Sequence, residues 1–392
     1  MNIDHLRQDT PGCKQCIHFN NAGASLPPAQ VTLAIQDYLH LESLAGGYEL
    51  ADAKASEIER FYTSAAQLIN AKPQNIAFTS SATNSFARAL SCIPFEAGDT
   101  ILIANEDYIS NQLAFLSLQK RFNIKLIRSK SLPEGGVDVA DLSHLMDKNM
   151  PKLVSLSHVP TNTGLVQPVE AVGQLCRERN ILYLVDACQS VGQLPVDVQK
   201  IQCDFLSATM RKFLRGPRGT GFLYVSNRVL EDGLEPLFID MRGADWTSAD
   251  CYTARTDARR FEDWELPYAL MVGAAAAVEY TLAVGVDKIV QRNRRLCQLL
   301  CKEIDSIGLR ILDVGTQRSS IITVEMKGKS PTETISFLRK RKINTSASLR
   351  NYAQVDFATK GVDWALRISP HYYNTENEIG LLVDALKDWM GR

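Results

Sequence analysis

Two neighbouring segments decide the fold: ILYLVDACQS (residues 181–190) and DFLSATMRKFLRGPRGTGFLYV (residues 204–225). The first is an apolar run that ends in Asp186, and Gln189 follows one helical turn later. The second places Lys212 between another apolar run and a glycine-rich stretch. Continuous apolar runs of this length are typical of strands buried on both faces of a parallel sheet. A carboxylate at the end of such a strand either caps a helix or pairs with a buried cation, or it faces a protonated heterocycle nitrogen.

The same kind of run recurs on either side of these segments. Seven β-rich runs follow one another: NIAFTS from Asn75, TILIA from Thr100, IKLIRS from Ile124, LVSLSHV from Leu153, ILYLVDA from Ile181, DFLSAT from Asp204 and TGFLYV from Thr220. Helix-like apolar spacing lies between some of them, at 84–92, 139–146 and 169–179. This alternation predicts an α/β fold with a mainly parallel sheet flanked by helices.

The pattern changes after Trp264. Residues 269–284 and 287–307 have the spacing of long helices. They are followed by a strand-like SSIITVEM, a helical 332–340, a strand-like WALRIS and a helical 376–390. We therefore predict an N-terminal arm (1–20), a large domain (21–264) and a smaller α+β C-terminal domain (265–392) that begins with a long linking helix.

Composition excludes several classes of protein. The chain has 392 residues and a formal net charge of −1, so neither nucleic acid nor an anionic membrane is an expected partner. Residues 1–12 lack an apolar signal core, and the apolar run 269–278 is too short to span a membrane, which predicts a cytoplasmic protein. The nine cysteines are scattered as free thiols would be. Cys13 and Cys16 form an isolated C-x-x-C without further ligands, so no metal site is expected.

Polar residues at the predicted strand ends are the candidates for chemistry, because ligands of α/β sheets bind there. A lysine in a basic loop is usually solvated. Lys212, however, is expected at the mouth of the sheet beside Arg211, where its pKa would fall as Schiff-base chemistry requires. In FTSSATNSFARAL, Ser81 can cap a helix whose first N–H groups, at residues 82–84, favour an anion.

These motifs, in this order, resemble the class V aminotransferase family, which also includes cysteine desulfurases and related carbon–sulfur lyases. The resemblance runs from HFNNAGASLPP at His18 to LRISPHYYNTENEI at Leu366. It implies the fold of PLP-dependent transferases of fold type I, with pyridoxal 5'-phosphate (PLP) as cofactor. It also implies an amino-acid substrate and a homodimer.

The resemblance assigns cofactor roles residue by residue. Lys212 would be the catalytic Schiff-base lysine, Asp186 would pair with the pyridine nitrogen, and Gln189 would face the phenolate oxygen. Tyr108 stands where many relatives have a histidine stacked on the ring. The phosphate would be held by Ala82, Thr83, Thr209 and Arg211.

The substrate roles follow in the same way. Arg367 matches the arginine that forks onto the substrate α-carboxylate, a task that guanidinium geometry suits. Either Thr161 or Asn162 falls where an asparagine near that carboxylate is usual. Asn21, with the residues up to Gly23, matches the segment that lines the substrate mouth.

Two departures from the family pattern bear on function. Arg211 replaces the usual histidine before the lysine, and ARRFEDWE (258–265) replaces a stretch that often ends in a threonine. Both features resemble those of the isopenicillin-N-epimerase-like and ergothioneine-pathway sulfoxide-lyase branch of the family. In addition, the C-terminal segment 348–361 has no cysteine, whereas desulfurases carry their persulfide cysteine there. The expected reaction is therefore β-elimination, with C–S bond cleavage of a cysteine-like substrate. Amino-group transfer and epimerisation are the alternatives within the enzyme class, and a non-catalytic scaffold is the alternative outside it.

The stretch ARRFEDWE (258–265) is expected at the dimer interface. It stands where relatives reach the partner's phosphate, and Arg259, Arg260 and Trp264 are residue types favoured in interface centres. The alternative is a surface loop whose arginines pair with Asp257 and Glu262.

Overall fold

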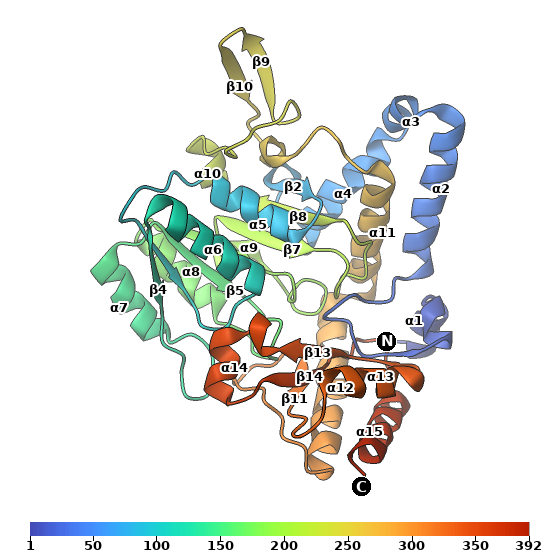
Figure 1. The fold of residues 1–392 in the computed structure, drawn as a ribbon. Coiled ribbons are helices and arrows are strands. Elements are labelled where there is room, and N and C mark those ends of the chain that lie inside the picture. Colours follow the sequence, from blue (N-terminus) through green and yellow to red (C-terminus); the bar gives the residue numbers. More distant parts are fainter. Residues whose placement is uncertain (392) are drawn as a thin grey trace.

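The computed structural model describes residues 1–391 and contains a large lobe with a seven-stranded sheet and a smaller C-terminal lobe (Figure 1). The sheet order is β2-β8-β7-β6-β5-β3-β4, and only β8 runs antiparallel to its neighbours. The strands are β2 (Ile76–Thr79), β3 (Thr100–Ile103), β4 (Lys125–Arg128), β5 (Leu153–Ser157), β6 (Leu182–Asp186), β7 (Phe205–Thr209) and β8 (Gly221–Val225). All seven runs predicted from the sequence are strands, so the α/β prediction is confirmed.

Helices cover both faces of this sheet, which explains why its strands are apolar throughout. The covering helices are α4 (Ala55–Leu68), α5 (Ala82–Ser91), α6 (Ile109–Phe122), α7 (Val139–Asn149), α8 (Val169–Glu178), α9 (Val198–Ile201) and α10 (Asn227–Glu231). One core includes residues of α4, α7 and α8, and the other includes residues of α5 and α6.

The change of lobe falls later in the chain than the sequence pattern indicated. Helix α11 (Tyr268–Val284) packs against α2 (Ala29–Ala45) and α4 and contributes to the core of the large lobe. Helix α12 (Val286–Ser306) follows after a bend of 77° at Gly285, whose φ is 90°. Within residues 1–391 no single helix is long and apolar enough to cross a membrane. Only α11 and α12 taken together pass that test of length and composition.

The small lobe is α+β, as predicted. Its three-stranded antiparallel sheet has the order β11-β14-β13, with helices α13 and α15 packed beside it. The elements are β11 (Ile322–Val324), α13 (Pro331–Lys340), β12 (Ile343–Asn344), β13 (Ser346–Leu349), a 3-10 turn (Arg350–Tyr352), α14 (Gln354–Lys360), β14 (Trp364–Ile368) and α15 (Glu376–Met390).

The N-terminal arm joins both lobes. It contains α1 (Ile3–Gln8), a 3-10 turn (Pro11–Lys14) and β1 (Ile17–His18), which pairs in parallel with β12. Arg215, only 1% exposed, donates to the hydroxyl of Thr10 in the arm at 2.5 Å and to the hydroxyl of Tyr372 at 2.6 Å. Its guanidinium also lies 4.5 Å from the ring centroid of Tyr373. The arm, the loop after Lys212 and the C-terminal lobe are therefore tied together by one buried cation.

The stretch 258–265, which was expected at a dimer interface, makes several buried contacts inside the monomer. Glu262 is fully buried and accepts from the backbone N–H of Phe78 at 2.7 Å, from the Tyr62 hydroxyl and from Arg242. Arg260 is buried and donates to two backbone carbonyls. Arg259 lies over the Tyr62 ring and pairs with Glu59. Of the residues expected at an interface, only Trp264 is exposed, at 42%.

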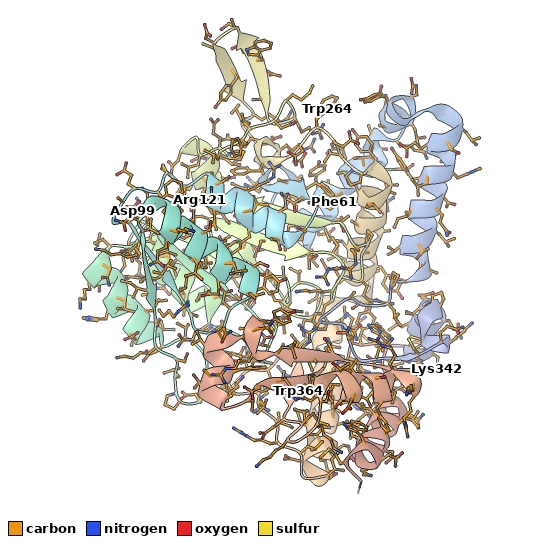
Figure 2. The ribbon with its side chains drawn as sticks, in the orientation of Figure 1. Phe61, Asp99, Arg121, Trp264, Lys342 and Trp364 are labelled. Atoms are coloured by element: carbon orange, nitrogen blue, oxygen red, sulfur yellow. The ribbon has the colours of Figure 1, made fainter. Side chains whose placement is uncertain are left out.

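A hairpin that the sequence did not reveal projects from the large lobe. It consists of β9 (Ala244–Ser248) and β10 (Cys251–Ala254) and stands clear of the body in Figure 1. Figure 2 places Trp264 near the base of this hairpin and Trp364 in the opposite lobe. A further short helix, α3 (Gly47–Ala53), follows α2.

Candidate active site

The strand-end residues meet between the lobes, as the topology requires. Asp186 is the last residue of β6, and Lys212 follows β7, the neighbouring strand. Both side chains are buried, at 6% and 8% exposed. The Nζ atom of Lys212 lies 5.8 Å from the ring centroid of Tyr108, the residue that precedes α6. One anion, one amine and one aromatic face are thereby brought together.

The carboxylate of Asp186 is held by two donors. One oxygen accepts from the amide of Asn111 at 2.9 Å, and the other accepts from the backbone N–H of Cys188 at 2.9 Å. The Asn111 amide also donates to Asp107 at 3.0 Å, so it bridges the two carboxylates. Asn111 and Asp107 were not among the residues predicted from the sequence. No local signal marks an asparagine in the first turn of an amphipathic helix as a partner of a residue 75 positions away.

Asp107 fixes the position of Tyr108. It accepts from the Tyr108 backbone N–H at 2.7 Å, from the Ser157 hydroxyl at 2.6 Å and from the Gln112 amide at 2.7 Å. Burial raises the pKa of Asp107 above its ordinary value, although these hydrogen bonds oppose the shift. The aromatic ring is thus placed by a carboxylate anchored to the end of β5.

The electrostatics of Lys212 suit a neutral amine. Burial lowers the pKa of Lys212 below its ordinary value, and the positive charges of Arg211 and Arg367 act in the same direction. Cys188 and Asp186 oppose the shift. An amine with a lowered pKa carries a free electron pair at a pH where an ordinary lysine is protonated.

Arg367, on β14, reaches this site from the small lobe. One of its terminal nitrogens donates to the Thr161 hydroxyl at 2.8 Å and the Thr161 carbonyl at 3.2 Å, and the other donates to the side-chain oxygen of Asn20 at 3.4 Å. Its Nε atom is buried and has no partner among residues 1–391. Burial lowers the pKa of Arg367 to about 10, and Arg211 adds to the shift.

The structure distinguishes Thr161 from Asn162, the two candidates for a residue near the substrate carboxylate. The Thr161 hydroxyl contacts both Arg367 and Gln189, whereas the Asn162 amide donates to the backbone carbonyl of Tyr352 and lines a different pocket. The side-chain nitrogen of Asn21 donates to the backbone carbonyls of His18 and Ser369, and its side-chain oxygen accepts from the Tyr373 hydroxyl. The N-terminal side chain in contact with Arg367 is therefore Asn20, and Asn21 supports the fold behind it.

Gln189 lies in the site in an orientation that differs from the expected one. Its amide nitrogen donates to the Ala22 carbonyl at 3.0 Å and the Thr161 hydroxyl at 2.8 Å. Its buried Oε1 atom has no partner among the described residues. Because Oε1 is an acceptor, Gln189 can donate to a phenolate only if its side-chain amide flips and exchanges the positions of Oε1 and Nε2.

The expected phosphate end is formed by the start of α5. Ser81 accepts from the backbone N–H of Asn84 at 3.1 Å and caps the helix, as predicted. Ala82 and Thr83 provide the next turn, and Thr209 lies across from them at the end of β7. Gly221 allows this close approach, because a Cβ atom there would lie 2.9 Å from the carbonyl carbon of Ser81. Arg211 donates to the carbonyl of Gly23.

These residues fit PLP. Two guanidiniums, Arg211 and Arg367, and the amine of Lys212 share the site with the carboxylate of Asp186, and the unpartnered Nε atom of Arg367 can receive an anion. A ligand with anionic groups and a protonatable ring nitrogen balances this distribution of charge. Among residues 1–391, no group of three or more His, Cys, Asp or Glu side chains is arranged to hold a metal ion.

Comparison with known proteins supports this assignment. The sequence model of the aminotransferase class-V family matches residues 17–382. A "Probable cysteine desulfurase" of Pyrococcus abyssi is 29% identical over 397 residues, which cover 98% of this chain and 97% of the relative. The apo structure of a cysteine desulfurase from Thermococcus onnurineus has a TM-score of 0.90 at 24% identity, covering 98% of this chain and 97% of that one. The cystine C–S lyase C-DES, in complex with its reaction product cysteine persulfide, has a TM-score of 0.86 at 21% identity, covering 97% and 99%. The two structures establish the shared fold.

We predict that Arg211→Gln raises the pKa of Lys212, because it removes a neighbouring positive charge. Only the neutral amine reacts with an aldehyde, so the pH profile of trapping should move to higher pH. Apo protein is mixed with saturating PLP and borohydride, and the rate at which PLP becomes covalently trapped on the protein is measured from pH 6 to pH 10.

Arg218→Gln is the matched control, since Arg218 is exposed and is not among the charges that shift Lys212. An unmoved midpoint in Arg211→Gln would contradict the prediction, as would an equal shift in both variants.

Proposed function

The chain belongs to the class V aminotransferase family of PLP-dependent enzymes, and from that premise we propose that it cleaves the C–S bond of a cysteine-like amino acid by β-elimination. The observation that carries the proposal is a site equipped to remove a proton from an amino acid, without a reactive thiol beside it. Its relatives named as cysteine desulfurases suggest a sulfur-containing substrate.

Transfer of sulfur to the protein requires a cysteine that can reach the substrate. The segment in which the resemblance places that cysteine forms β13, a 3-10 turn and α14 here, and it contains none. The charge of Cys188 acts on the pKa of Lys212, so this cysteine lies close to the lysine. Burial, reinforced by Asp186, raises the pKa of Cys188 well above its ordinary value, which keeps the thiol protonated and a poor nucleophile.

The side chains can divide the work of elimination. Arg367 binds the substrate carboxylate through its free Nε atom, while Thr161 and Asn20 orient the guanidinium. Lys212, with its lowered pKa, takes the proton from Cα. Asp186 keeps a proton on the cofactor's ring nitrogen. When bound, PLP supplies an electron sink for the carbon that loses its proton.

The overall reaction balances without any oxidant. A substrate R–S–CH2–CH(NH3+)–COO− and one water give R–SH, pyruvate and ammonium. The Cβ–S bond breaks with its electron pair on sulfur, and the released thiol carries a proton. Sulfur transfer to a protein cysteine would instead leave alanine and a persulfide. The two routes are therefore distinguished by their carbon product.

We predict that the holoenzyme converts a cysteine thioether or sulfoxide into pyruvate and ammonia in equal amounts, with no alanine. Lys212→Ala should lose about 10²- to 10⁴-fold in rate, the usual contribution of a positioned general base, while its circular dichroism spectrum stays unchanged. Pyruvate, ammonia and alanine are quantified from the same reaction over a panel of cysteine derivatives.

Cys188→Ala serves as the companion variant and should still produce pyruvate. Alanine as the main product, together with a persulfide that is required for turnover, would refute elimination. Amino-group transfer to an added keto acid without release of sulfur would identify a transaminase instead.

We propose further that the working unit is a homodimer formed through the projecting hairpin region. This region exposes large apolar side chains before and within the hairpin: Leu237 (66%), Phe238 (83%), Met241 (67%) and Trp246 (80%). Exposed clusters of apolar and aromatic side chains mark protein interfaces. The resemblance implies a second copy as the partner. We place its contact at this patch instead of the stretch 258–265, because Arg260 and Glu262 of that stretch are buried inside the monomer.

We expect the double variant Phe238→Asp, Trp246→Asp to be monomeric at concentrations where the wild type is a dimer, because two buried charges would oppose association. Sedimentation velocity at several concentrations measures this. Met150→Asp is the control, since Met150 is 72% exposed on the C-terminal end of α7, away from the hairpin. A monomeric wild type, or a double variant that still dimerises, would contradict the proposal.

A further inference from the structure

A second cavity lies between the lobes. It has a volume of about 1130 Å³ and is lined by residues at the start of α8, by one face of α12 and by the loop 316–320. None of the residues that surround Lys212 in the proposed PLP site lines it. Gln193 connects the two places, since its amide donates to the carbonyl of Gln189 and accepts from the backbone N–H of Ser320. The cavity therefore lies behind the active site and is separate from it.

Four buried side chains that line this cavity each have a polar atom without a partner among residues 1–391. They are His158 (Nδ1), Gln167 (Nε2), Asn293 (Oδ1) and Ser319 (Oγ), which are 7%, 2%, 4% and 5% exposed. An unsatisfied buried polar group costs about 1–3 kcal/mol, so such a concentration indicates a place built for a polar occupant. In Gln167 the other amide atom is already engaged, since Oε1 accepts from Val137 N–H at 2.8 Å. Its free atom is a donor.

Two arginines and one exposed carboxylate, that of Glu170, line the cavity, so the charge of its side chains is positive on balance and favours an anion. The first residues of α8, Val169 to Ala171, line the cavity, and Pro168 before them offers no side-chain cap. The Val169 N–H donates to the Gln167 carbonyl at 2.9 Å, so the N–H groups left for a ligand are those of Glu170 and Ala171. The start of a ten-residue helix carries a partial positive charge. Arg294 and Arg318 also line the cavity, are exposed, and have no carboxylate partner among residues 1–391.

Two further observations describe the occupant. Burial raises the pKa of Cys301, and Arg318 acts against that shift, which places the guanidinium close to a thiol that lines the cavity. Apolar side chains such as Val166, Leu194 and Val290 complete the walls. The space thus combines free donors with apolar surface, as sites for organic anions do.

We propose that this interlobe cavity binds a multiply charged organic anion, a metabolite with phosphate or carboxylate groups, and that Gln167, Ser319, Arg294 and Arg318 recognise its charge. The ligand contacts the large lobe through α8 and the small lobe through α12 and the loop 316–320. Binding therefore stabilises one arrangement of the lobes around the active site. The site is independent of the reaction proposed above.

The test uses the PLP-loaded protein, so that the cofactor phosphate site is already filled, with pyrophosphate and citrate as the two probes. Isothermal titration calorimetry should show one saturable site per chain for at least one probe. Pyrophosphate alone identifies a phosphate ligand, and citrate alone a carboxylate ligand. The double variant Arg294→Ser, Arg318→Ser should weaken binding at least about tenfold, which corresponds to about 1.4 kcal/mol. Arg121→Ser, an exposed arginine on the far end of α6, should leave it unchanged (Figure 2).

A second readout locates the ligand without relying on affinity. Cys301 lines the cavity and Cys251 is exposed on the hairpin, so saturating probe should slow iodoacetamide alkylation of Cys301 and leave that of Cys251 unaltered. Peptide mass spectrometry measures both sites in one sample. Binding of neither probe would overturn the proposal. So would binding that the arginine pair does not affect, or protection that is equal at both cysteines.

Discussion

The structure depends on the burial of one amine, Lys212, beside one carboxylate, Asp186, with two guanidiniums close by. Two guanidiniums that lack a carboxylate partner among residues 1–391 are unfavourable in a largely buried space without an anionic ligand, because desolvation penalises each unpaired charge. Adjacent parallel strands place Asp186 and Lys212 side by side, and the small lobe brings Arg367 to the same point. The fold thereby maintains a charge imbalance that a cofactor with phosphate and a substrate with carboxylate relieve.

Much of this arrangement can be predicted from the sequence, because its signals are local. Apolar runs that end in polar residues indicate buried parallel strands, and all seven are found in the sheet. The cap at Ser81 can likewise be read from a serine before a helix pattern. The α/β class, the α+β small lobe and the strand-end positions of Asp186 and Lys212 all follow from such signals.

The contacts that could not be predicted are those between distant residues. Asn111 bridges Asp107 and Asp186 across two elements, and nothing in the periodicity of α6 distinguishes it from other polar positions. Arg367 donates to Asn20, which a parallel bridge to Ser369 places next to the end of β14. Arg259 and Arg260 suggested an interface. Inside the monomer, however, Arg260 donates to two backbone carbonyls and Arg259 lies over the Tyr62 ring. Tertiary packing decided each of these cases.

The central claim is that Lys212 is the residue to which PLP becomes covalently attached. The direct measurement is reduction of the holoenzyme with borohydride, digestion, and mass spectrometry of the peptides to find the pyridoxyl group. We predict a single modified site at Lys212, in the peptide that follows β7, with one group per chain. A pyridoxyl group on any other lysine, or a protein that binds PLP without forming a reducible bond, would contradict the account.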